Sequence, residues 1–144
     1  MEVLPNQGIG EVRFGMTVTE VKAILGENQK WEEEWMDPIH GGHYPGLQLI
    51  FTGPGVTDDS RLIEICMHRD FIEIPLTFRG APFFQLTWEY FEILMKAESI
   101  PYEFTTVWNE IYLGGDYSMD LFFDEEDILC RAWMYSTAEY GRWY

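Results

Sequence analysis

A helical repeat of apolar side chains follows residue 17, at Val18, Val21, Ile24 and Leu25. These positions fall on one face of a helix. Thr17 is a good N-cap residue, and Glu20 stands at the third helical position, where its side chain completes a capping box. Gly26 follows as a natural helix terminator. The pattern predicts a helix of about nine residues, which is too short to be stable alone and must pack against other elements.

Strand patterns follow this helix. Leu47–Phe51 alternates between apolar and other positions, and Leu62–Met67 is a second apolar run. A further strand is expected over Lys30–Met36, although polar and apolar residues alternate imperfectly there. The turn-rich connection Thr52–Ser60 separates the last two strands. One helix followed by three strands predicts an α+β unit.

The second half of the chain repeats this order of elements. Phe84–Thr87 resembles Phe14–Thr17 at an offset of 70 residues, and Thr87 is the expected cap of a second helix. The matching elements that follow are a helix carrying Phe91, Leu94 and Met95 and strands over Phe104–Trp108, Met119–Phe123 and Ile128–Met134. Short strands are also expected before each helix, over residues 11–14 and 74–78. Five elements in the same order indicate an internal duplication.

The sequence therefore predicts one α+β domain over residues 1–144, built from two tandem repeats at about 8–70 and 76–137. Each repeat is expected to contribute a short helix and three to four antiparallel strands. Neither repeat could bury its own sheet face well. We therefore expect the two repeats to share one larger sheet, with both helices on one face.

The segment Gly10–Gly26, with Phe14-Gly15-Met16-Thr17 at its centre, resembles the helix-entry motif of the β-lactamase-inhibitor-protein-like superfamily. The tandem arrangement is similar to that of the inhibitor protein itself, so the resemblance spans most of the chain. The second copy, Phe84–Thr87, lacks the glycine. The resemblance implies a module of helices on a sheet that binds other proteins. It does not indicate a particular partner.

Composition and charge narrow the function classes. The chain is 47% hydrophobic and 17% aromatic, which supplies a core and argues against disorder. Its formal net charge of −16 repels nucleic-acid phosphates and anionic lipids. We therefore expect no nucleic-acid or membrane partner. The same charge attracts basic proteins, although acidity could also serve solubility alone.

The two cysteines and the N-terminus indicate a cytoplasmic protein. Cys66 and Cys130 lie in apolar runs without metal-like spacing and are typical of reduced core residues, although a disulfide between them stays open. The first residues, Met1–Pro5, show no secretory signal, although a leader could have been removed. No stretch approaches the 18 apolar residues of a membrane span.

Acidic and aromatic residues give the candidate partner-binding site. In Trp31–Trp35, Glu32 and Glu34 fall on one face of the expected strand and both tryptophans on the other. The tryptophans could serve as core or as a binding anchor. Asp124–Asp127 occupies an expected strand-to-strand turn and could clamp a cationic side chain. The predicted partner-binding residues are Trp31, Glu32, Glu34, Asp116, Asp120, Asp124, Glu125, Glu126 and Asp127.

Metal, cofactor and catalytic motifs are not recognisable. His40-Gly41-Gly42-His43 lacks a third ligand nearby, and the two glycines favour a hairpin turn. No nucleotide loop or nucleophile motif is present. The sequence therefore predicts no metal, no cofactor and no catalytic residue, and hence no enzyme. A less favoured alternative is an enzyme with a carboxylate site between the repeats.

These observations favour a non-catalytic protein-binding module, acting as a monomer or a weak dimer. The specific expectation is a bacterial immunity protein that neutralises a cognate basic toxin, such as a nuclease, through an acidic surface. The alternative is a housekeeping or envelope-related scaffold or inhibitor module that binds its partner through an apolar patch.

Overall fold

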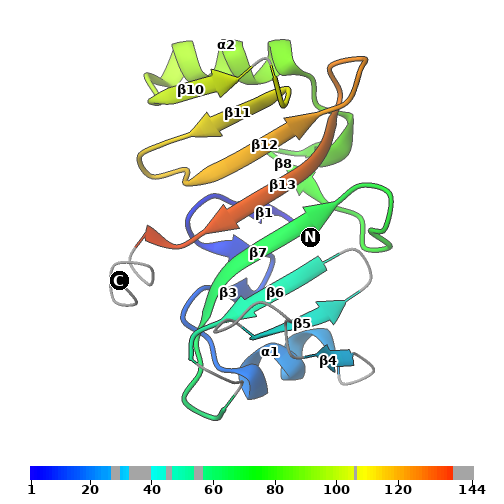
Figure 1. Cartoon of the computed structure of the whole chain (residues 1–144), viewed down its shortest axis with the longest axis vertical. Helices are drawn as coiled ribbons and strands as arrows, with labels where there is room; N and C mark the ends of the chain where they lie inside the picture. Colours follow the sequence, from blue (N-terminus) through cyan, green and yellow to red (C-terminus); the bar gives the residue numbers. More distant parts are fainter. Residues whose placement is uncertain (27–29, 33–39, 45–46, 54–56, 106, 138–144) are drawn as a thin grey trace.

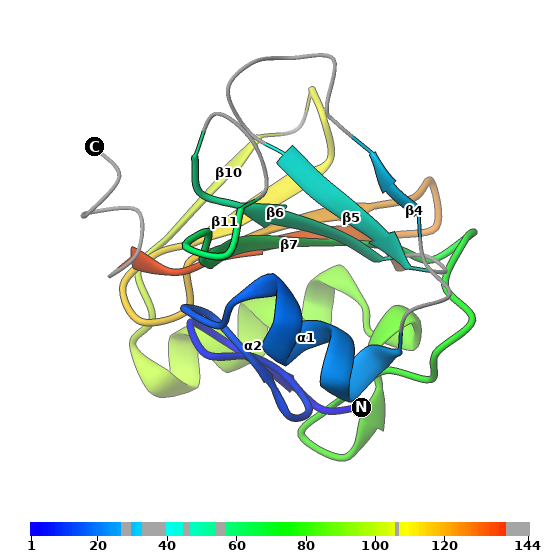
Figure 2. The same cartoon turned by 90° about the horizontal axis from the view of Figure 1, so that it is seen from below.

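The chain folds into two layers. In the computed structural model, which describes residues 1–26, 47–53, 57–105 and 107–137 and, by backbone alone, 30–32 and 40–44, one layer is a sheet of eight strands. The other layer holds both α-helices and the smaller sheets. Figures 1 and 2 show that α1 and α2 lie on the same side of the eight-stranded sheet, and the described residues place no helix on the opposite side.

The helices are α1 (Val18–Leu25), the 3-10 helix η1 (Phe83–Gln85) and α2 (Trp88–Glu98). The strands of the large sheet are β4 (Lys30–Glu32), β5 (His40–Tyr44), β6 (Leu47–Phe51), β7 (Leu62–His68), β10 (Tyr102–Thr105), β11 (Glu110–Leu113), β12 (Met119–Phe123) and β13 (Leu129–Tyr135). The other strands form a three-stranded sheet, β1 (Val3–Leu4), β2 (Gly8–Ile9) and β3 (Val12–Arg13), and a pair, β8 (Thr77–Phe78) and β9 (Ala81–Pro82).

The large sheet consists of two antiparallel meanders joined at its centre. Its strand order is β10-β11-β12-β13-β7-β6-β5-β4, so the last strands of the two meanders pair with each other (Figure 1). At that junction Cys66 of β7 lies opposite Trp133 of β13. The predicted α+β class is therefore confirmed, with sheets built from antiparallel pairs.

The two meanders share a register irregularity. The pairing of β6 with β7 shifts between Ile50 and Phe51, and the pairing of β12 with β13 shifts between Phe122 and Phe123. Each shift falls between the last two residues of its strand. In both strands the alternate side chains that face the helices are buried: Leu47, Leu49 and Phe51 in β6, and Met119, Leu121 and Phe123 in β12.

Both α-helices begin at the predicted threonine caps. The Oγ1 atom of Thr17 accepts a hydrogen bond from the Glu20 amide at 3.2 Å, and Glu20 Oε1 accepts one from the Thr17 amide, which confirms the capping box. At the start of α2, Thr87 Oγ1 accepts from the Tyr90 amide at 3.2 Å. The first helix ends before Gly26, whose φ of 93° suits a residue without a Cβ atom.

The core lies between the two layers. Val21 of α1 and Phe91, Leu94 and Met95 of α2 are buried against it. The Phe91 ring meets Phe123 of β12 edge to face, with ring centroids 6.0 Å apart. Burying a side chain of this size stabilises the fold by roughly 1.5–3 kcal/mol. The short helices are therefore held by tertiary packing.

Two local predictions are wrong. Gly41 and Gly42 do not form the hairpin turn that the sequence predicts, because both lie inside β5, and Gly42 pairs with Trp31 on one side and Leu49 on the other. The strand predicted over Phe104–Trp108 is instead β10, which begins at Tyr102 and ends at Thr105. The sequence analysis also missed β5 and β11 as strands.

Other predictions hold in part. The strand predicted over Lys30–Met36 begins as expected, but the described β4 covers Lys30–Glu32, and residues 33–36 lie outside the described residues. Cys66 and Cys130 are not joined by a disulfide, which resolves the alternative that the sequence left open. In the described part of the chain, no helix is long and apolar enough to cross a membrane.

Candidate functional site

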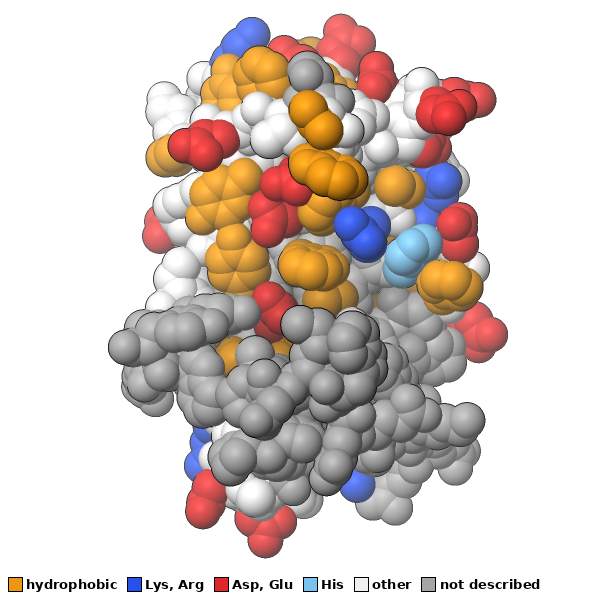
Figure 3. Space-filling view, in the orientation of Figure 1, with side chains coloured by type: hydrophobic (Ala, Val, Ile, Leu, Met, Phe, Trp, Pro, Cys, Tyr) orange, Lys and Arg blue, Asp and Glu red, His pale blue; other side chains and the backbone are white. Residues whose placement is uncertain are grey.

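The side of the large sheet opposite α1 and α2 presents a cluster of acidic and aromatic residues. In β12, Asp120 and Phe122 alternate with buried residues and therefore point to this side. The register places Tyr112 of β11 and Trp133 of β13 directly beside Asp120. We define the open-face patch as Glu64, Glu110, Tyr112, Asp120, Phe122, Arg131 and Trp133. Figure 3 shows hydrophobic and acidic side chains intermixed on the upper half of this face, with a few basic side chains among them.

Three carboxyl groups gather in this patch. The pKa of Asp120 is raised from 3.8 to about 6, mainly by burial and then by the charges of Glu110 and Glu64 and a hydrogen bond with Glu110. Glu110 comes from β11 and Glu64 from β7, so three strands supply the cluster. Carboxylates that repel one another in a half-buried setting favour either a proton or an incoming cation.

An arginine lies among the aromatic residues of the patch. The Arg131 guanidinium lies 4.3 Å from the ring centroid of Phe122 and 5.8 Å from that of Trp133. The two rings are themselves edge to face, 6.3 Å apart. Among the described residues, Arg131 Nε is the one buried side-chain nitrogen or oxygen without a hydrogen-bond partner. The stack gives the patch a rigid apolar body beside its carboxylates.

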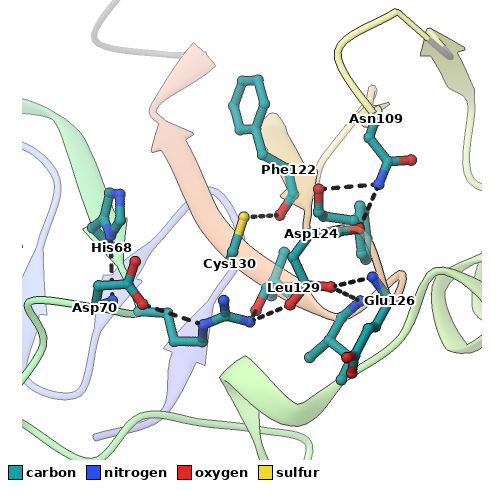
Figure 4. Close-up of polar contacts among 11 residues, drawn as sticks. His68, Asp70, Asn109, Phe122, Asp124, Glu126, Leu129 and Cys130 are labelled. Carbon is teal, nitrogen blue, oxygen red and sulfur yellow. Dashed lines mark hydrogen bonds and ion pairs between the residues drawn. The ribbon is translucent and has the colours of Figure 1, made fainter.

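The acidic turn Asp124–Asp127 connects β12 and β13, as predicted, and its first carboxylate is used inside the protein (Figure 4). Asp124 Oδ2 accepts from Arg69 at 2.7 Å, while Oδ1 accepts from the amides of Glu126 and Ile128. The hydrogen bond from Arg69 is the main reason that the pKa of Asp124 is lowered. Asp124 therefore orders the turn and ties it to the loop after β7.

The same turn is joined to α2 and to β11. The Asp127 carbonyl accepts from the Trp88 amide at 2.9 Å. Asn109 Nδ2 donates to the carbonyl oxygens of Phe123 and Asp124, at 3.0 and 2.8 Å (Figure 4). Glu125 and Glu126 have exposed side chains. Asp127 is exposed as well, so three of the four predicted site residues in this turn are placed for an external contact, while Asp124 has internal partners.

The predicted site residues do not form one cluster. Asp116 is exposed in the turn before β12, and the acidic turn follows the same strand, so Asp116 and the acidic turn lie at opposite ends of β12. Trp31 and Glu32 lie in β4, which four strands separate from β12 in the sheet order. Glu34 lies outside the described residues. Asp120 is the predicted residue that belongs to the open-face patch.

Sequence reasoning missed most of the open-face patch. Glu64, Glu110, Tyr112, Phe122, Arg131 and Trp133 were not singled out. A usable signal was present in β12 and β13, where non-core residues alternate with buried ones. That alternation identifies the outward face of each strand, but the neighbours of a strand depend on the sheet order.

Metal ligands do not gather in the described residues, where no group of three or more His, Cys, Asp and Glu side chains is arranged to hold an ion. His40 and His43 lie in β5, for which the backbone alone is described. The Cys130 thiol donates to the Phe122 carbonyl at 3.3 Å, and burial raises its pKa (Figure 4). A thiol with a raised pKa is a weaker nucleophile at neutral pH.

Comparisons of the chain with protein-family models, with curated proteins and with solved structures found no match.

Proposed function

We propose that this chain is a non-catalytic protein-binding module that docks a basic protein against its open-face patch. The observation that carries the proposal is the clustering of three carboxyl groups with exposed aromatic surface on the sheet face opposite α1 and α2. Trp133, at 39% exposure, is the most exposed aromatic ring of the patch. Buried aromatic anchors and charged pairs are the groups that dominate protein interfaces.

The chemistry of the patch favours a cationic partner. Asp120, Glu110 and Glu64 destabilise one another when all three are charged, and a lysine or arginine from a partner would relieve that repulsion. The net charge of −16 extends the attraction beyond contact distance and speeds the encounter. Tyr112, Phe122 and Trp133 would then supply the apolar contact area.

The specific form of this proposal is a bacterial immunity protein that covers the active site of a basic toxin, such as a nuclease. Cationic groups that bind substrate phosphates in such a toxin would meet carboxylates of this chain. The charge supports this assignment, as does a site that resembles an interface and contains no recognisable nucleophile or cofactor motif.

We also propose that the chain arose by internal duplication and is related to the β-lactamase-inhibitor-protein-like superfamily. Three features support a duplication. Each threonine-capped helix is followed by four strands in the same order, and β6 and β12 have matching register shifts. The Leu62 and Leu129 amides also donate to the carbonyls of Met16 and Leu86, one residue before each cap. The repeats would be related by a two-fold axis through the Cys66–Trp133 pair.

A pull-down from the source cell tests the proposed binding. The immobilised chain is expected to retain a basic protein at low salt and to release it as salt rises. Trp133→Ala and Glu110→Gln should each reduce retention. Ile93→Ala and Glu11→Gln are the matched controls, because Ile93 is exposed on α2 and Glu11 is exposed between β2 and β3.

The proposal fails if no basic protein is retained, or if the patch variants and their controls behave alike. Retention that is lost in Trp133→Ala but does not depend on salt would instead support an apolar scaffold contact. The immunity assignment requires, in addition, that the retained protein is toxic and that this chain inhibits it.

A further inference from the structure

We propose that the free edge of β10 and the adjacent face of α2 form a second binding surface, which takes an extended, cationic peptide segment as an added strand. This surface adjoins the open-face patch at the Glu103–Tyr112 pair, but its hollow lies on the helix side of the sheet, and the proposal does not depend on the patch. Strand addition to an exposed sheet edge is a recurring way to bind peptides, in which main-chain hydrogen bonds give affinity and side-chain pockets give specificity.

The edge itself is available for pairing. β10 is the outermost strand of the eight-stranded sheet and pairs with β11 alone (Figure 1). All four of its residues are exposed. Natural edge strands are commonly protected by charged side chains, prolines or bulges, or by being short. Strand β10 is short and carries one charge, Glu103, but it has no lysine, internal proline or bulge, so its protection is selective against acidic partners.

The hydrogen-bond pattern shows which groups face the free edge. The Gly114 amide donates to the Pro101 carbonyl at 2.8 Å, so Pro101 is directed toward β11. In an antiparallel pair this direction alternates along the strand, so Glu103 and Thr105 also bond to β11. The amides and carbonyls of Tyr102 and Phe104 therefore point outward, and no described residue pairs with them.

A hollow beside this edge provides a side-chain pocket. Its volume is about 110 Å³, and it is lined by Trp88, Glu92, Met95, Tyr102, Phe104 and Ile111. The Trp88 ring meets Phe104 edge to face at 6.0 Å and fixes one wall. Because a cavity of about 150 Å³ admits a benzene ring, this hollow suits a smaller aliphatic side chain such as valine or leucine. Tyr102 and Phe104 are still 39% and 57% exposed, so the wall is incomplete without an occupant.

Charge selects the occupant. Glu92 lines the hollow, whereas Glu103, which pairs with Tyr112, lies on the opposite face of β10. An added strand would therefore place aliphatic side chains toward the hollow and basic side chains toward Glu103. Lys96 Nζ lies 4.0 Å from Glu92 Oε2, but both side chains are well exposed. This ion pair is therefore weak, and a cation from a partner can replace Lys96. A second copy of the chain would bring another β10, with its own Glu103, and another net charge of −16 to the same edge. We therefore assign the edge to a segment in which basic and aliphatic residues alternate.

A synthetic peptide of eight residues, alternating lysine and valine, is the probe. We expect it to bind the full chain and to protect the amides of Tyr102 and Phe104 from hydrogen exchange. Methylating the peptide's edge-pairing amides should weaken binding at least about tenfold, because it removes main-chain hydrogen bonds. A glutamate-for-lysine peptide should not bind. Glu103→Gln should weaken binding up to about fivefold, because the lysines of the added strand lie on the face of Glu103, while Glu89→Gln, an exposed residue on α2, should not.

Three results would overturn the inference. The first is binding that N-methylation leaves unchanged, and the second is protection of amides elsewhere than β10. The third is a salt-stable dimer of the free chain in sedimentation, with protection of the same two amides, which would give the edge to a second copy. Trp133→Ala should leave peptide binding unchanged. Phe104→Ala, which removes a wall of the hollow on the helix side of the sheet, should leave the basic partner of the open-face patch unaffected, so the two surfaces can fail separately.

Discussion

Replacing Asp120 with Asn is expected to stabilise the folded protein at neutral pH. Burial, with Glu110 and Glu64 nearby, raises the pKa of Asp120 from 3.8 to about 6. The unfolded chain releases this proton near pH 3.8, so the folded state binds more protons between the two values. Folding stability supplied by the protonated group is therefore fully present below pH 3.8 and is lost as the pH rises through about 6.

The structure bounds the size of this effect. One unit of pKa corresponds to about 1.4 kcal/mol, so ionising Asp120 in the folded protein costs at most about 3 kcal/mol. Asp120 is half-buried, and solvent screens part of the repulsion from Glu110 and Glu64. Arg131, on the same face, is stacked on Phe122 and forms no ion pair with the carboxyl groups among the described contacts. We therefore expect Asp120→Asn to stabilise the protein by about 1–2 kcal/mol above pH 7.

Urea denaturation at a series of pH values measures this difference. The gain of Asp120→Asn over the wild-type protein should shrink toward zero as the pH falls to about 4, where the native carboxyl group is protonated. Asp116→Asn is the matched control, because Asp116 is exposed in a turn. If the stability gain of Asp120→Asn does not change with pH, or if the variant is less stable at neutral pH, then burial and the neighbouring carboxylates are not what raise the pKa of Asp120.

Other expectations concern the core, a helix cap and a thiol. Phe91→Ala should cost about 3–5 kcal/mol in urea denaturation, because this buried ring packs between α2 and the sheet; a cost below 1 kcal/mol would contradict that packing. Thr17→Ala should lower the free energy of unfolding by about 1 kcal/mol, while Thr19→Ala, exposed in the first turn, should change it less. The Cys130 thiol should react with a disulfide reagent more slowly in the native protein than after unfolding, since burial raises its pKa; equal rates would show that the native site does not protect it.

Local signals predicted the helices well. Thr17 with Glu20, and Thr87, were identified as caps because a capping contact spans only three residues and depends little on the rest of the fold. The helical spacing of Phe91, Leu94 and Met95 also predicted the buried face of α2, since all three side chains are buried. Strands β6 and β12 were predicted with correct bounds because their alternation of apolar residues is regular.

Local signals did not predict the glycine-containing strand β5 or the short strand β11. Gly41 and Gly42 favour a turn when considered alone, but pairing with β4 and β6 holds them in an extended strand. Strand β11 is four residues long and follows Asn109, whose φ of 49° belongs to a turn. Ladder hydrogen bonds to both neighbours stabilise such segments, and a sequence window does not contain those neighbours.

By itself, the sequence determined the helix caps, the outward and inward positions of the regular strands, and the acidity of the surface. Only the tertiary structure decided which outward positions meet. Glu64 and Asp120 are brought to one cluster because β13 inserts between β7 and β12. Asp116 and Asp124 lie at opposite ends of β12, away from this cluster, although both are much closer to Asp120 along the chain. The physical reason is that side-chain direction repeats every two residues within a strand, whereas strand order is set by contacts between distant segments.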